Sequence, residues 1–187
     1  MKNYLYIITI AICLKIIYVI WGVSFSLVVS PEYYDYKNDG FTSIFNRNDA
    51  QWYEKIVTSG YPEVQKIEDL GSCIDGVKVQ SAWAFFPLYP TLIKSTHWLT
   101  GWSFNISAFI WSVIFSLLCF TGFYRLVKST FFDEKTAFFA TLVLMLFPFH
   151  YYFSVFYTEA LFFCFTIWSF IIIQSKKHIL LPLTLIP

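Results

Sequence analysis

Residues 104–124 read FNISAFIWSVIFSLLCFTGFY and contain no Lys, Arg, Asp or Glu. A helix needs about 20 predominantly apolar residues to cross the hydrocarbon core of a bilayer, so this stretch is long enough to span one. Three further stretches share this apolar character, at 4–29, 136–156 and 157–175, although Pro148 interrupts one of them. The sequence therefore predicts an all-α membrane protein, a multi-pass bundle of transmembrane helices.

The overall composition agrees with this class of protein. Hydrophobic residues make up 57% of the 187 residues and charged residues only 13%, with a mean hydropathy of +0.58. Soluble domains carry about 25% charged residues, so the chain lacks the charge to cover a soluble globule. This composition excludes a water-soluble enzyme and a disordered chain. The net charge of +1 provides no basic surface for nucleic acid, and we expect no nucleic-acid partner.

Basic residues near the ends of the predicted spans set the expected orientation, because cytoplasmic connections are enriched in Lys and Arg. We therefore expect a cytoplasmic N-terminus, a long outer segment at 30–103, and a location in the plasma membrane, or in the endoplasmic reticulum membrane for a eukaryotic source. The last apolar stretch, 178–187, is too short to cross a bilayer and is predicted to begin a truncated fifth span. Counting spans places these basic residues on one side: Lys2, Arg125, Lys128, Lys135, Lys176 and Lys177.

The outer segment 30–103 carries nine of the twelve acidic residues. Aromatic residues recur through it, which argues against a disordered linker. Asp49 can N-cap a helix over 50–59 that ends at Gly60, and a second helix is predicted to follow Pro87. Both helices are short, aromatic and amphipathic, which is typical of helices that lie at a membrane surface.

Three short blocks of sequence resemble a family signature in their order and approximate spacing. They are FNRNDAQWY at 45–53, AFFPLYP at 84–90, and Phe147-Pro148 followed by SVFYTE at 154–159. The set is similar to the motifs of the class V (PIG-V-like) mannosyltransferases of glycosylphosphatidylinositol synthesis and their bacterial relatives. Those enzymes belong to the GT-C group of polytopic glycosyltransferases, and the chain resembles their N-terminal part. Asn48 stands where the family usually has a tryptophan.

The resemblance implies transfer of a hexose, mannose in that family, from a polyprenyl-phosphate donor to a lipid or glycan hydroxyl at the outer face, with inversion. Asp49 would act as the general base for the acceptor hydroxyl. Arg47 would suit the donor phosphate, which a guanidinium binds as a fork. Glu159, predicted on the same side as Asp49, would orient a sugar hydroxyl or support the loop. No cofactor is assigned, although a divalent cation is compatible with this chemistry. Aromatic candidates for lining a sugar or prenyl groove are Trp52, Tyr53, Phe86 and Tyr89.

Each of these residues also has a purely structural interpretation. Asp49 could serve only as a helix cap, Arg47 could form a loop ion pair with it, and Glu159 could interact only with a helix dipole. Lys15, a charge deep in the first span, is a functional candidate but could equally have a structural partner. For the whole chain, the alternative is a non-catalytic membrane scaffold, a transporter component or an inactive truncated remnant, surrounded by membrane lipids.

Overall fold

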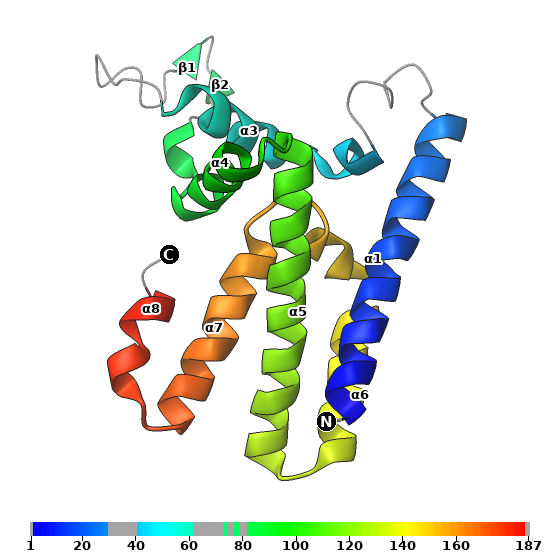
Figure 1. The fold of residues 1–187 in the computed structure, drawn as a ribbon, viewed down its shortest axis with the longest axis vertical. Helices are drawn as coiled ribbons and strands as arrows, with labels where there is room; N and C mark the ends of the chain where they lie inside the picture. Colours follow the sequence, from blue (N-terminus) through cyan, green and yellow to red (C-terminus); the bar gives the residue numbers. More distant parts are fainter. Residues whose placement is uncertain (1, 30–40, 62–72, 75–76, 79–81, 186–187) are drawn as a thin grey trace.

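The computed structural model describes residues 2–29, 41–61, 73–74, 77–78 and 82–185 (Figure 1). The described part is helical apart from one antiparallel pair of two-residue strands, in which Cys73 pairs with Lys78 and Ile74 with Val77. The α-helices are α1 (Lys2–Val29), α3 (Asp49–Ser59), α4 (Leu88–Thr100), α5 (Phe104–Phe131), α6 (Glu134–Leu146), α7 (Glu159–Gln174) and α8 (Pro182–Leu185). The remaining elements are 3-10 helices η2 (Phe41–Phe45), η4 (Ala82–Ala84), η5 (Pro148–Phe153) and η6 (His178–Leu180), and strands β1 (Cys73–Ile74) and β2 (Val77–Lys78).

Among the described residues, two helices are long and apolar enough to cross a membrane, over Lys2–Val28 in α1 and over all of α5. At 1.5 Å per residue, each is about 40 Å long. They overlap the expected spans 4–29 and 104–124, but α5 continues through Phe131 before Phe132 ends it in a left-handed conformation, with φ 55°. A helix this long brings basic residues such as Lys128 into its last turn, which the helix dipole favours.

The expected span 136–156 is not one continuous helix. Helix α6 has only 13 residues and ends at Leu146, after which Phe147 is extended and Pro148 opens η5. A proline disfavours helical geometry in the residue before it and cannot donate its own backbone hydrogen bond. The expected span 157–175 corresponds to α7, a 16-residue apolar helix that begins at Glu159.

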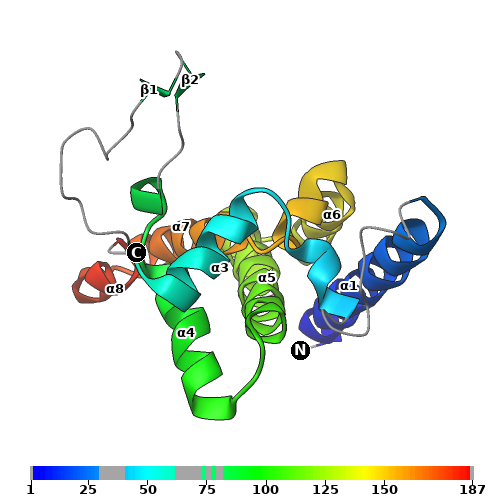
Figure 2. The same cartoon turned by 90° about the horizontal axis from the view of Figure 1, so that it is seen from above.

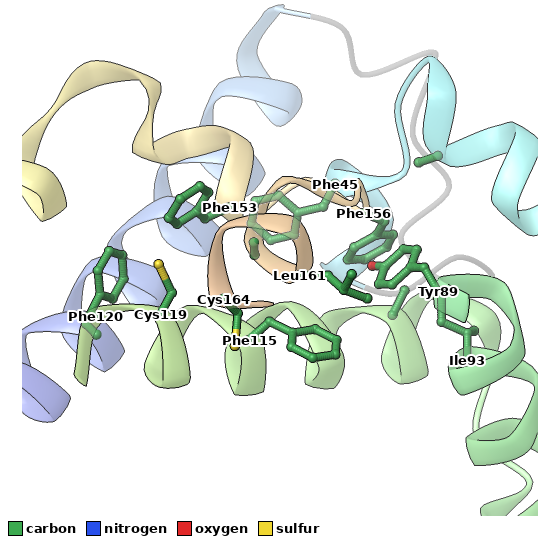
Figure 3. Close-up of a cluster of buried hydrophobic side chains, with 14 of the residues drawn as sticks. Phe45, Tyr89, Ile93, Phe115, Cys119, Phe120, Phe153, Phe156, Leu161 and Cys164 are labelled. Carbon is green, nitrogen blue, oxygen red and sulfur yellow. The ribbon is translucent and has the colours of Figure 1, made fainter. Parts of the chain in front are cut away.

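Helix α5 lies at the centre of the bundle, packed against α7, α6, α1 and α4. Helices α5 and α7 approach closely at Gly122, where a Cβ would lie 3.0 Å from the Trp168 indole nitrogen. The same nitrogen donates to the carbonyl of Leu118 at 3.1 Å. The missing side chain therefore admits a large ring between the two helices. Figure 3 shows the buried side chains along this contact, among them Phe115, Cys119, Phe120, Leu161 and Cys164.

The two short helices expected in the outer segment are confirmed. Helix α3 ends at Gly60, which has φ 78°, and α4 begins directly after Pro87. Figures 1 and 2 show both helices at the end of the bundle where α5 begins. Parts of two predictions lie outside the described residues: the outer segment at 30–40, 62–72, 75–76 and 79–81, and the end of the predicted fifth span at 186–187. Residues 178–185 form η6 and α8, and Thr184 Oγ1 accepts a hydrogen bond from Ser169 in α7.

Candidate functional site

The three sequence blocks come together at one end of the bundle. The backbone N–H of Phe156 donates to the carbonyl of Phe45 at 3.2 Å, which joins the segment before α7 to the end of η2. The hydroxyl of Tyr53 donates to Thr158 Oγ1 at 3.4 Å, which joins α3 to the same segment. Tyr53 also makes edge contacts with Phe85, at a centroid distance of 5.0 Å. Segments far apart in sequence therefore form a single site.

Asp49 is the first residue of α3, and its side chain is exposed. The prediction that Asp49 is the N-cap is wrong, because the cap position is Asn48, whose side chain makes no capping hydrogen bond. A carboxylate in the first turn is still favoured by the helix dipole. Asn48 has φ 43° and ψ −108°, a positive φ that is uncommon for residues other than glycine and is more often found in asparagine than in most of them.

Glu159 is the first residue of α7 and is also exposed. Its carboxylate is close enough to that of Asp49 for the two negative charges to repel each other. Both acids therefore lie at helix N-termini that meet at one place. Between them, the hydroxyl of Tyr157 interacts with the Asn48 side chain and with the backbone of Asp49. Tyr157 was not among the predicted site residues, although its position in the third sequence block, 154–159, could have indicated it.

Arg47 is exposed and lies beside Tyr151, close enough for its charge to act on that phenol. Both side chains line a cleft of about 480 Å³ between α1 and η2. The other walls are mainly apolar, from side chains such as Trp21, Phe25 and Ile44. The cleft thus combines one cation with an aromatic and aliphatic wall, a combination suited to the phosphate end of a lipid.

The four aromatic candidates are divided between the core and the surface. Tyr53 and Tyr89 are only 5% and 1% exposed, and their rings meet edge-on at 5.2 Å. Burial raises the pKa of both phenols, so both hydroxyls stay protonated at neutral pH. Trp52 is partly buried and stacks on Phe85, whereas Phe86 is 72% exposed. Trp52 and Phe86 therefore keep ring surface that a ligand could touch, while the two tyrosines hold α3 against α4.

The hydroxyl of Tyr89 is buried without a hydrogen-bond partner among the described residues. Figure 3 shows its oxygen directed toward Phe156, in the apolar contact between α4 and the segment before α7. A buried hydroxyl without a partner costs about 1–3 kcal/mol relative to a satisfied one. This cost makes Tyr89 a sharp test position, because removing the oxygen changes nothing else in the packing.

The described residues contain no group of three or more His, Cys, Asp or Glu side chains that could hold a metal ion. The carboxylates of Asp49 and Glu159 are the acidic pair at this site, and neither was predicted to bind a metal. Comparison of the chain with protein-family models, with curated proteins and with solved structures finds no significant match.

Proposed function

We propose that the chain is a membrane glycosyltransferase that moves a hexose, mannose by resemblance, from a polyprenyl phosphate to an acceptor hydroxyl at the outer face. The observation that carries this proposal is that the first and third blocks of the family-like signature meet, with Arg47 and Asp49 in the first and Glu159 in the third. Two helices of spanning length support a membrane location. The three residues supply a cation and two carboxylates at one end of such a bundle.

The proposed reaction is a single displacement. The Asp49 carboxylate accepts the proton of the acceptor hydroxyl as that oxygen attacks the anomeric carbon of the donor sugar. The bond from this carbon to the phosphate oxygen breaks on the opposite side, and the lipid phosphate leaves with the electron pair. Attack from the side opposite the leaving group inverts the anomeric configuration. No protein nucleophile is needed, because the phosphate is already a good leaving group.

Arg47 would hold the departing phosphate. A guanidinium stays charged at every physiological pH and binds phosphate oxygens through two parallel hydrogen bonds. The N-termini of α3 and α7 add partial positive charge at the same place. The apolar wall of the cleft beside Arg47 would take the first isoprene units of the lipid. Glu159, repelled by Asp49 and exposed, is available to accept hydrogen bonds from sugar hydroxyls.

The test of this proposal is a transfer assay with the chain in lipid nanodiscs. The donor is a mannosyl-phosphoryl polyprenol of known anomeric configuration, and the acceptor is a mannoside of a long-chain alcohol. We expect release of polyprenyl phosphate together with a product of inverted configuration, read by proton NMR. A product with retained configuration would overturn the single displacement, and no turnover with a panel of hexosyl donors would overturn the transferase proposal.

A transporter component is the competing proposal, and the interruption between α6 and α7 favours it. Transporters often use interrupted helices to form binding sites inside the membrane. The two proposals differ in what happens to a labelled polyprenyl-phosphate sugar in sealed vesicles. A transferase changes its chemistry, whereas a transporter moves the intact molecule from one leaflet to the other.

A further inference from the structure

Lys15 lies in the middle of α1 and is only 4% exposed. At 1.5 Å per residue it is about 20 Å from either end of the helix. Its amino group donates hydrogen bonds to the backbone carbonyl of Phe153 at 2.5 Å and to Ser154 Oγ at 3.0 Å. A polar group at this depth is costly unless it is paired. Here both partners come from the point where η5 ends.

The chain around Phe153 has no continuous helical ladder of hydrogen bonds. Between η5 and α7 the described backbone bonds are short-range turns, such as Ser154 N–H to Tyr151 O at 2.8 Å, together with the long-range bond from Phe156 N–H to the Phe45 carbonyl. Irregular backbone at membrane depth is tolerated only where protein groups satisfy its N–H and C=O groups. The Phe153 carbonyl receives two such donors, from Lys15 and from Ser116 Oγ at 3.3 Å. Side chains of α1 and α5 thus replace the missing helical bonds.

The bonded carbonyl lies three residues before Phe156, whose N–H binds the Phe45 carbonyl. The position of the interruption therefore sets the position of Tyr157 and Glu159 against α3. Without donors for Phe153 and Ser154, this segment would lose its fixed attachment to α1. The hydrogen bond between Tyr53 of α3 and Thr158 would then join α3 to a segment whose own position is no longer fixed.

We infer that Lys15 is a positioning residue, which fixes the η5–α7 turn to α1 and so holds Tyr157 and Glu159 opposite Asp49. This inference rests on the proposed function for its effect on transfer, but the attachment itself can be measured separately. The first readout is hydrogen exchange of peptides covering 148–158 in nanodiscs. The second is the split between kcat and KM for transfer.

Three variants test whether Lys15 attaches the η5–α7 turn to α1 through its hydrogen bonds or only fills space in the core. Lys15→Met keeps the volume and removes the donor, Lys15→Arg keeps a donor, and Ser154→Ala removes one partner without touching α1. In Lys15→Met we expect exchange of the 148–158 peptides to rise about tenfold, with protection of α5 unchanged. Kcat should fall at least about tenfold, with little change in the KM of the donor. Ser154→Ala should give a smaller change in the same direction, and Lys15→Arg should restore most of both readouts.

Lys94→Met provides the matched control, because it makes the same substitution at an exposed lysine of α4. Wild-type protection of 148–158 in Lys15→Met would overturn the attachment. Equal loss of protection throughout the bundle, without rescue by Lys15→Arg, would also contradict it, because Lys15 would then act only in general packing. If Lys15→Met does not fold, Ser154→Ala decides: unchanged exchange and kcat would overturn the inference. A wild-type protein without transfer activity would refute the proposed function, while the exchange readout would still decide the role of Lys15.

Discussion

The hydrogen bond from the Phe156 N–H to the Phe45 carbonyl connects the segment before α7 with the segment before α3. Asp49 and Glu159 each follow one of these bonded residues by a few positions. The bond therefore fixes the distance between the two helix N-termini that carry the candidate acids. The geometry of this site depends on the backbone of both segments. Substitution of a residue that contacts ligand should therefore change kinetics, whereas substitution of a residue that packs the two segments together should change stability.

Arg47→Lys should weaken donor binding. Lysine keeps the positive charge but loses the planar fork that binds two phosphate oxygens, so we expect the KM of the lipid donor to rise about tenfold, with a smaller effect on kcat. Steady-state kinetics in nanodiscs measures this split. Arg125→Lys, the same change in α5 beside Trp168, should leave both constants unaltered. An unchanged KM in Arg47→Lys would contradict phosphate binding at this position.

Tyr89→Phe should be neutral or should stabilise the protein by up to about 1 kcal/mol, since it removes a buried hydroxyl that has no partner. Tyr124→Phe makes the same change at an equally buried residue, whose hydroxyl accepts a hydrogen bond from Asn3 at 3.1 Å. That variant should cost about 1 kcal/mol. Thermal unfolding in nanodiscs compares the two. A clear loss of stability in Tyr89→Phe would show that its hydroxyl has a partner after all.

Gly122→Val should separate α5 from α7. Its side chain would press against Trp168 and Ile167, which lie 3.0 and 3.1 Å from where a Cβ would be, and overpacking of this kind costs about 1–3 kcal/mol. Thr121→Val introduces the same residue one position away and should cost less. The melting temperatures of the two variants are compared in nanodiscs, and we expect the lower one for Gly122→Val. Equal melting temperatures would contradict a close contact at Gly122.

Stability should fall on the alkaline side, above the ordinary tyrosine pKa of 10.0. Burial raises the pKa of Tyr53 and Tyr89 in the folded protein, so the folded state keeps protons that the unfolded state loses. The folded state is therefore fully favoured below pH 10 and progressively less so above it. Tyr53→Phe should flatten this decline between pH 10 and 11, measured by thermal unfolding. If stability of Tyr53→Phe declines with pH as steeply as that of the wild type, other titrating groups cause the loss of stability above pH 10.

Part of this arrangement could be predicted from the sequence. Gly60 and Pro87 set the end of α3 and the start of α4 because each imposes a specific backbone geometry. The predicted N-cap of α3, Asp49, is one residue away from the observed one, Asn48. Asparagine and aspartate are both good capping residues, so the sequence alone does not distinguish the two positions. Apolar composition at 136–156 predicted a single helix, but Pro148 divides it.

Other features depend on tertiary contacts that no local pattern contains. The partners of Lys15 are a backbone carbonyl and a serine that become available only because the helix is interrupted. The sequence predicted that Tyr53 and Tyr89 line a ligand groove, but aromatic residues occur in cores as well as at binding surfaces. Both tyrosines are buried because α3 packs against α4, a contact between segments that are separate in the sequence.

In the proposed reaction Asp49 removes the proton of the acceptor hydroxyl. This role is tested by kcat for hexose transfer by Asp49→Asn, compared with Asp133→Asn in the same nanodiscs. Asp133 caps α6, and asparagine can cap equally well, so this control should keep wild-type turnover. Loss of a general base predicts that kcat of Asp49→Asn falls by about 10²–10⁴, with unchanged thermal stability. Turnover within a few-fold of wild type in Asp49→Asn would show that Asp49 is not the general base.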